Sequence, residues 1–199
     1  MEVVEGMVPI SSSEFLNPFY LGECPVTQAQ WEAVMGENPS CFKGAGNPVE
    51  QVSWNDCQKF LKKLNLHPVV QESGFIFRLP TEREWECACR AGASGVYCKL
   101  ADGTEITEST IERVAWFGNN SNGKTHPVGL KEPNAFGLYD MYGNVWEWTE
   151  TTNGRLCVLR GGGWNDSPKD YEFSLRDLFS SSFRSSYLGF RLCASGRVD

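Results

Sequence analysis

Helix signals fill the first half of this sequence and strand patterns fill the second, and this order limits the fold more than any other feature. Thr27–Gln30 and Thr81–Glu84 are capping boxes, in which the first and fourth residues satisfy each other's free backbone N–H groups. Ser53 opens a further helix, whose apolar residues recur at helical spacing. We expect these three helices to end at Gly36, Gly92 and Pro68, respectively.

Short runs in the rest of the chain have the composition or the alternation of strands. They are Phe75–Leu79, Val145–Trp148, Cys157–Arg160 and Phe190–Cys193. From Tyr97 to Ser121 the helical signal is weak, and we expect loops there. Early helices and late strands are typical of an α+β fold. Because there is no internal repeat and no linker, the sequence predicts a single domain over residues 1–199.

The charge of the chain excludes several classes of partner. Its 25 acidic and 18 basic side chains give a net charge of −7, whereas nucleic acids and anionic membranes need clustered Lys and Arg. No apolar run approaches the roughly 18 residues of a membrane span, so no transmembrane segment is expected. The first residues lack the basic start and the apolar stretch of a signal peptide.

The eight cysteines leave two possibilities open. An even number suits disulfides in a secreted protein, whereas a chain of 199 residues buries enough core to fold with free thiols. There is no CxxC pair, and the only histidines are His67 and His126, each before a proline and each expected to be structural. A structural zinc site is therefore not expected.

The segment from 165 to 188 differs in composition from its surroundings. Its 24 residues include seven Ser, three Phe and two Tyr, without helical or strand periodicity. Irregular segments longer than about 12–15 residues are usually functional or disordered, and so many aromatic residues disfavour disorder. A mixture of Tyr and Ser is typical of binding surfaces such as paratopes. The alternative is a surface loop whose aromatic side chains pack on the core.

Seven strings in a fixed order carry a family resemblance. They are Pro25–Gln28, Asn47–Trp54, Arg78–Glu86, Asn134–Met141, Gly143–Trp148, Arg160–Trp164 and Gly189–Leu192. Together they resemble the formylglycine-generating-enzyme family, also called sulfatase-modifying domains, over most of the chain. The resemblance implies a C-type lectin fold of that type, rich in loops, with helices against a small twisted antiparallel sheet.

The resemblance does not extend to the catalytic residues of that family. The resembling enzymes use two redox-active cysteines just beyond the string that ends at Trp164, in a stretch that also binds copper. No cysteine occurs from Asn165 to Leu188, and Asp cannot carry out oxidative thiol chemistry. The sequence therefore predicts a protein that is not an enzyme. The alternative is an oxidative maturation enzyme of this family with altered active-site chemistry.

A closer resemblance is to the variable proteins of diversity-generating retroelements, of the Treponema type. In that family a C-terminal segment is rewritten by adenine-directed mutagenesis and displayed for ligand binding. An Asn codon randomised at its adenines yields Phe, Ser, Tyr, Leu, Asp, Pro and Asn among others, but never Lys, Glu, Gln, Met or Trp. Only Lys169 and Glu172 fall outside that set between residues 165 and 188.

This resemblance implies a receptor-like or adhesin-like protein at the cell surface or outside the cell. Its ligand would be an unknown protein or other macromolecule, bound by the segment. The side chains predicted to bind it are Asp166, Ser167, Asp170, Tyr171, Leu175, Asp177, Leu178, Phe179, Ser182, Phe183, Ser185, Ser186 and Tyr187.

A fixed frame is expected beneath this face. Arg176 and Arg184 should point inward or pair with acids. We expect substitutions of the face to change stability by at most about 0.5 kcal/mol. The aromatic side chains predicted to be buried in the frame are Trp54, Trp85, Trp146, Trp164 and Phe190.

The family resemblance also implies a calcium site. The side chains of Asp140 and Glu147 and the carbonyls of Gly143 and Val145 would hold the ion, since calcium prefers oxygen ligands. The alternative is a turn held by hydrogen bonds without a metal. No other cofactor is expected.

Overall fold

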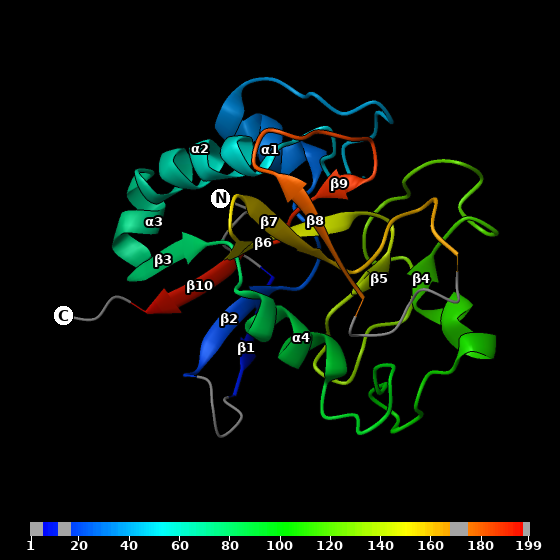
Figure 1. Ribbon diagram of the computed structural model, residues 1–199. Coiled ribbons are helices and arrows are strands. Elements are labelled where there is room, and N and C mark those ends of the chain that lie inside the picture. The colour runs from blue at the N-terminus through cyan, green and yellow to red at the C-terminus, as the bar shows by residue number, and fades with distance from the viewer. Residues whose placement is uncertain (1–5, 12–16, 168–174, 197–199) are drawn as a thin grey trace.

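The computed structural model describes residues 6–11, 17–167 and 175–196, and Figure 1 shows its arrangement. Four α-helices and one 3₁₀ helix occur among these residues, together with three sheets. The helices are α1 (Gln28–Met35), α2 (Trp54–Asn65), α3 (Pro68–Ser73), α4 (Glu82–Arg90) and the 3₁₀ helix η1 (Glu108–Arg113). This is the α+β architecture that the order of helices and strands predicts, and it agrees with the C-type lectin fold that the family resemblance implies.

The strands are short. They are β1 (Met7–Ile10), β2 (Phe19–Gly22), β3 (Phe75–Arg78), β4 (Ala115–Trp116), β5 (Tyr142–Gly143), β6 (Trp146–Asn153), β7 (Leu156–Arg160), β8 (Arg176–Ser180), β9 (Leu188–Gly189) and β10 (Cys193–Gly196). Two sheets have four strands each, in the orders β1-β2-β10-β3 and β8-β7-β6-β9. Most pairs are antiparallel, as predicted, but β4–β5 and β6–β9 are parallel.

The predicted helix starts are confirmed. Thr27, Ser53 and Thr81 each accept a hydrogen bond from the backbone N–H three residues later, and the side chain at that later position bonds back. The helix that Ser53 opens, α2, ends at Asn65, three residues before Pro68, and Pro68 also begins α3, which was not predicted. Proline is favoured at the first helical position, where its missing N–H leaves no bond unmade.

The predicted strand Phe190–Cys193 is also placed differently. Only Cys193 belongs to a strand, and the three residues before it connect β9 to β10. All three are buried, and two of their carbonyls accept hydrogen bonds from outside the strand pairs: Val26 N donates to Phe190 O, and Gly22 N, at the end of β2, donates to Leu192 O. An alternating pattern cannot distinguish such a buried connection from a strand.

The five aromatic side chains predicted to be buried in the frame differ in how far they are buried. Trp85, Trp146 and Phe190 are buried, but Trp54 and Trp164 are only half-buried, so the prediction was wrong for those two. Each lies at the margin of the core and directs its Nε1 to a carbonyl, Thr149 O and Ser186 O respectively, at 3.0 Å. Such a ring keeps one edge in solvent and the other in the core.

The helices of the described residues are all too short or too polar to cross a membrane.

Candidate functional site

The described part of the segment from 165 to 188 includes β8, one edge strand of the second four-stranded sheet, and Leu188, which begins β9 at the opposite edge. The expectation of a wholly irregular segment was wrong, because it contains β8, which pairs antiparallel with β7. β8 lacks a strand pattern of its own, since its side chains are exposed or half-exposed on both faces. The pairing is supplied by the apolar neighbour β7, which is why sequence reasoning missed it.

Of the side chains predicted to bind a ligand, those that the structure describes are all exposed or half-buried. Ser167, Asp177 and Ser182 are exposed. The half-buried ones are Asp166, Leu175, Leu178, Phe179, Phe183, Ser185, Ser186 and Tyr187. Asp170 and Tyr171 lie outside the described residues.

Four aromatic or aliphatic members of the face also touch the core. Phe179 and Phe183 stack on each other with ring centroids 4.4 Å apart and planes 10° apart. Both pack against the buried cluster around Trp31 and Phe190, as do Leu175 and Tyr187. Substitutions there remove apolar contacts, so we now expect losses above the surface range that was predicted for the whole face.

The backbone of the segment is tied to the frame. Asn55 N donates to Ser181 O (3.1 Å) and Gln51 N to Ser185 O (2.9 Å), which fixes the loop after β8 against the start of α2. Trp146 N donates to Tyr187 O at 2.8 Å. Because these bonds use main-chain carbonyls, they survive a change of side chain.

Asp166 differs from the other predicted ligand residues. Its Oδ2 accepts from Trp146 Nε1 and from Gly163 N, both at 2.7 Å. The carboxylate therefore closes the turn after the glycine-rich string, in addition to any contact with a ligand.

The two arginines of the segment pair with acids, as predicted. Arg184 bonds Asp56 with its Nη2 2.6 Å from Oδ2, and Arg176 Nε lies 2.9 Å from Glu82 Oε1. Burial alone would raise the pKa of Asp56, but hydrogen bonds from Ser53, Arg184 and Lys59 outweigh it and lower the pKa to about 2. Each arginine thus joins the segment to the first turn of a helix, α2 or α4.

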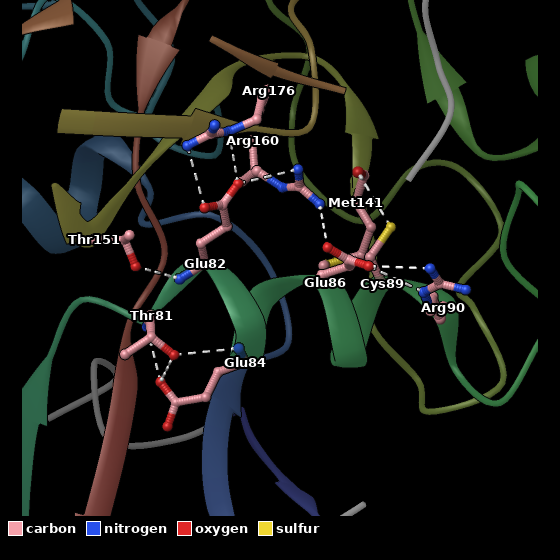
Figure 2. Close-up of polar contacts among 10 residues, drawn as sticks. All are labelled: Thr81, Glu82, Glu84, Glu86, Cys89, Arg90, Met141, Thr151, Arg160 and Arg176. Atoms are coloured by element: carbon pink, nitrogen blue, oxygen red, sulfur yellow. Dashed lines mark hydrogen bonds and ion pairs between the residues drawn. The ribbon is translucent and has the colours of Figure 1, made fainter. Parts of the chain in front are cut away.

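A charged network connects β8 to α4, and Figure 2 shows its members. Glu82 lies between Arg176 and Arg160, which are directly opposite each other on β8 and β7. Arg160 is 1% exposed and also bonds Glu86 at 3.1 Å. Two arginines in register repel each other, so the shared carboxylate of Glu82 is what allows this pairing.

The string proposed for calcium is held by a second buried arginine. Glu147 and Arg191 are both fully buried and form two bonds of 2.7 Å, and Trp85 Nε1 donates to Glu147 at 2.6 Å. Arg191 also donates to the carbonyls of Gly22 and Tyr139. This satisfies both charges with hydrogen bonds, the condition for burying an ion pair.

These residues, as they lie, do not fit a calcium ion. A guanidinium already contacts both oxygens of Glu147, and Asp140 accepts from Gly129 N at 2.8 Å. Gly143 and Val145, the other two predicted ligands, are buried in the same turn. Among the described residues, no group of three or more His, Cys, Asp or Glu side chains could hold a metal. The contacts described here are those of a turn held by hydrogen bonds, and calcium binding at this turn stays a prediction that the chelator experiment below tests.

Asp140 is buried without a strong counter-charge of its own. Burial raises its pKa from 3.8 to about 6, against the lowering effects of Gly129 N–H, Arg191 and Asn144. Its φ of 53° is in the left-handed region, where Asp and Asn are tolerated best.

All eight cysteines are free thiols. Burial raises the pKa of Cys24, Cys98 and Cys193 to about 12, and it also raises the pKa of Cys57, Cys89 and Cys157. The thiolate is the reactive and metal-binding form, so burial suppresses thiol chemistry at these six. Cys41 is exposed, and Cys87 is half-buried.

Sequence reasoning missed Arg160 and Arg191 as organising residues. A signal was present, because each is a single charged residue within an apolar run, Cys157–Arg160 and Phe190–Cys193. A charge inside a run that is otherwise core indicates a buried, paired side chain.

Comparisons with known proteins agree with this fold. The family model described as the sulfatase-modifying factor enzyme 1-like domain matches residues 2–195. The chaperone protein LppX of Paenibacillus barcinonensis is 32% identical over 90% of this chain and 81% of its own length. The inactive C-alpha-formylglycine-generating enzyme 2 of Bos taurus is 30% identical over 86% of this chain, which spans 58% of that protein.

Among solved structures, variable protein 1 of Treponema denticola superposes with a TM-score of 0.76 at 30% identity. The match covers 94% of this chain and 90% of the other. Proteins named formylglycine-generating enzyme are also among the relatives. The chain therefore belongs to the sulfatase-modifying factor enzyme 1-like family, which includes enzymes, inactive members and a chaperone.

Proposed function

We propose that this chain is a non-enzymatic ligand-binding protein whose recognition face is the segment from 165 to 188. One observation carries the proposal: the segment is held by its backbone and by two arginines, while its other described side chains, apart from the buried Leu188 at its end, remain exposed or half-buried. A surface built in this way can change its side chains and keep its shape. Two stacked phenylalanines surrounded by serines supply contact area with adaptable hydrogen bonds.

Two further observations support the absence of catalysis. The segment has no cysteine where the family's enzymes have their redox pair, and six of the eight thiols have a raised pKa. The similarity to an inactive formylglycine-generating enzyme and to a variable protein agrees with this. Incubation with a cysteine-containing sulfatase peptide should give no aldehyde, and turnover would favour the alternative, an enzyme with altered chemistry.

We also propose that a retroelement diversifies the segment and that the protein acts at the cell surface or outside the cell. The support is the residue set between 165 and 188 and the similarity to a variable protein. The test is the DNA beside the gene. A second copy of these codons that differs at adenines, next to a reverse transcriptase gene, is expected; a neighbourhood without either would refute diversification.

Ligand binding itself can be tested without knowing the natural partner. A displayed library randomised at Asp177, Ser182 and Ser185 should remain folded and should yield binders to a chosen protein such as hen egg lysozyme. A matched library at Trp85, Glu147 and Arg191, which are buried, should lose the folded state. If the first library unfolds as often as the second, the segment is core and the proposal fails.

A second candidate follows from the similarity to a chaperone. In that case the same face would bind one client protein, and its sequence would be constant among isolates. Comparing the segment in closely related strains distinguishes the two, because a client-binding face stays constant while a diversified one varies.

A further inference from the structure

One side of the β8 backbone faces away from β7. Thr149 Oγ1, on β6, donates to Val158 O at 3.0 Å, so the main chain of Val158 faces β6. Because backbone groups alternate sides along an antiparallel strand, Cys157 and Leu159 face β8 instead. Leu178 is paired in register with Val158. Its own N–H and carbonyl therefore point away from the sheet.

The outward N–H of Leu178 has a local partner. It donates to Oδ1 of Asp177, the residue before it, at 2.7 Å. This carboxylate oxygen stands in for the carbonyl oxygen that an adjoining strand would supply. Within the described ranges, no strand lies on this side of β8, and no donor bonds the carbonyl of Leu178. The outer edge of β8 is thus closed only by one exposed side chain of its own.

The other edge strands of the two larger sheets are closed more firmly. On β3, Phe77 N donates to Asn65 Oδ1 at 2.9 Å, and Asn65 Nδ2 donates to Phe77 O at 2.7 Å. Phe75 N donates to Ser73 Oγ. β1 contains Pro9, which has no N–H, and β9 has only two residues, both buried. Caps and prolines of this kind prevent strand pairing at an edge.

An exposed strand edge selects an extended polypeptide. Outward groups recur at every second residue, here Arg176 and Leu178, about 6.6 Å apart. Another strand has the same repeat, and peptides add to sheet edges in this way. The half-buried side chains of Leu178 and Phe179 lie on opposite faces of β8, so apolar residues of an added strand would gain contact on both.

The charges at this edge favour a peptide that is not acidic. Arg176 is already paired with Glu82 at 2.9 Å, whereas the carboxylate of Asp177 is exposed. Like charges directly opposite each other on neighbouring strands are destabilising. An acidic residue beside Asp177 would therefore be disfavoured, and a neutral, apolar strand would not.

We propose that the outer edge of β8 binds an extended, non-acidic segment of the ligand as an added strand, and that residue 177 controls access to this edge. The added strand gives a carbonyl to Leu178 N–H and an N–H to Leu178 O, and the carboxylate of Asp177 turns to solvent. This inference rests on the ligand-binding function proposed above. Because Asp177 belongs to the segment proposed to vary, a change there also changes how open the edge is.

The test uses the neutral peptide N-acetyl-Thr-Val-Thr-Val-Thr-amide as the probe, at millimolar concentration, with amide hydrogen exchange of the whole chain measured by NMR. At nine-tenths saturation, exchange of Leu178 N–H should slow about tenfold, because only the free tenth of the protein exchanges. The N–H of Phe179, which faces β7, should not change. The same peptide methylated at every backbone nitrogen is the control, and equal protection by it would overturn strand addition.

Two variants of one residue separate the cap from its charge. Asp177→Ala removes the cap, so it should tighten probe binding by about fivefold, the value of one neutral hydrogen bond that no longer has to be broken. Asp177→Asn keeps an acceptor oxygen and removes the charge, so its affinity should stay close to that of the native protein. Equal tightening in both variants, or no change in either, would overturn the role of residue 177.

A second copy of this chain is the other possible occupant of the edge. Protection of Leu178 N–H that rises with protein concentration in the absence of the probe would assign the edge to self-association and overturn the proposal. Pairing of two β8 edges would break the Asp177 cap in both copies, whereas a ligand strand breaks only one.

Strand addition and the variable face can fail independently. If the probe protects Leu178 N–H in neither the native protein nor Asp177→Ala, but the library yields binders to lysozyme, only strand addition is refuted. If the probe protects Leu178 N–H and the library yields no binders, the edge site stands and the variable face is refuted.

Discussion

Removing the carboxylate of Glu82 is the sharpest perturbation that the structure suggests, because this one group separates two opposed arginines (Figure 2). The variant Glu82→Gln keeps the shape of the side chain and its backbone bond to Thr151. It removes the charge that faces Arg160 at 3.4 Å and Arg176 at 2.9 Å.

The expected loss can be worked out from the two pairs. Breaking a buried pair costs about 3–5 kcal/mol, but Arg160 keeps Glu86 at 3.1 Å, and the side chain of Glu82 is 20% exposed. We therefore expect about 2 kcal/mol from Arg160. The pair with the more exposed Arg176 contributes less than about 1 kcal/mol. The sum is a loss of about 2–3 kcal/mol in the free energy of unfolding.

Urea unfolding at pH 7 measures this loss, with Glu132→Gln as the matched control. Glu132 pairs with Arg113 at 2.7 Å, but both side chains are at least one-third exposed and screened by solvent, so its loss should be clearly smaller than that of Glu82→Gln. Amide hydrogen exchange should also accelerate in β8 in Glu82→Gln and not in the control. Equal losses in the two variants, with β8 unchanged, would refute the reasoning that Glu82 holds the segment.

Three further predictions concern the frame. Asp140→Asn should stabilise the fold at pH 7 by up to about 3 kcal/mol, because burial raises the folded-state pKa from 3.8 to about 6. The stability that the neutral acid contributes is complete below pH 3.8 and is lost as the pH rises through 6. The free energy of unfolding should therefore fall between pH 4 and 7 in the native protein and not in the variant. Parallel pH profiles of the two proteins would contradict this. EDTA should leave the melting temperature unchanged, since Arg191 neutralises Glu147, and a rise with added calcium would show that a metal replaces the guanidinium. Trp85→Ala should lower the free energy of unfolding in urea by about 3–5 kcal/mol, and Trp164→Ala should lower it clearly less, because Trp164 is only half-buried. Similar losses in the two variants would show that burial does not determine how much each tryptophan contributes to stability.

The elements with local signals could be predicted from the sequence. The three helix starts depend on side chains within four residues of each other, so Thr27, Ser53 and Thr81 identify them without tertiary information. The apolar strands β6 and β7 were found for the same reason. The arginine pairs of the segment followed from residue type, since a charged side chain near a core surface needs an acid.

The elements that depend on distant partners could not be predicted. β8 forms a strand because β7 supplies the backbone partners for its hydrogen bonds, and β1 depends on β2 in the same way. The ion pair between Glu147 and Arg191 joins residues 44 positions apart. The residues next to each of them in the sequence do not indicate which partner it has. The calcium expectation came from resemblance alone and could not account for the guanidinium that faces the same carboxylate.

The structure also limits how freely the segment can vary. Its backbone carbonyls and two arginines fix its path, so exposed positions such as Asp177 and Ser182 can change without loss of shape. Phe179 and Phe183 are different, because the two half-buried rings stack on each other and pack against the core. A polar side chain there would uncover apolar surface at about 25 cal/mol per Å². Under the function proposed above, recognition and stability are therefore separable over most of the described face and are coupled at its aromatic centre, where a ligand would gain the most from contact.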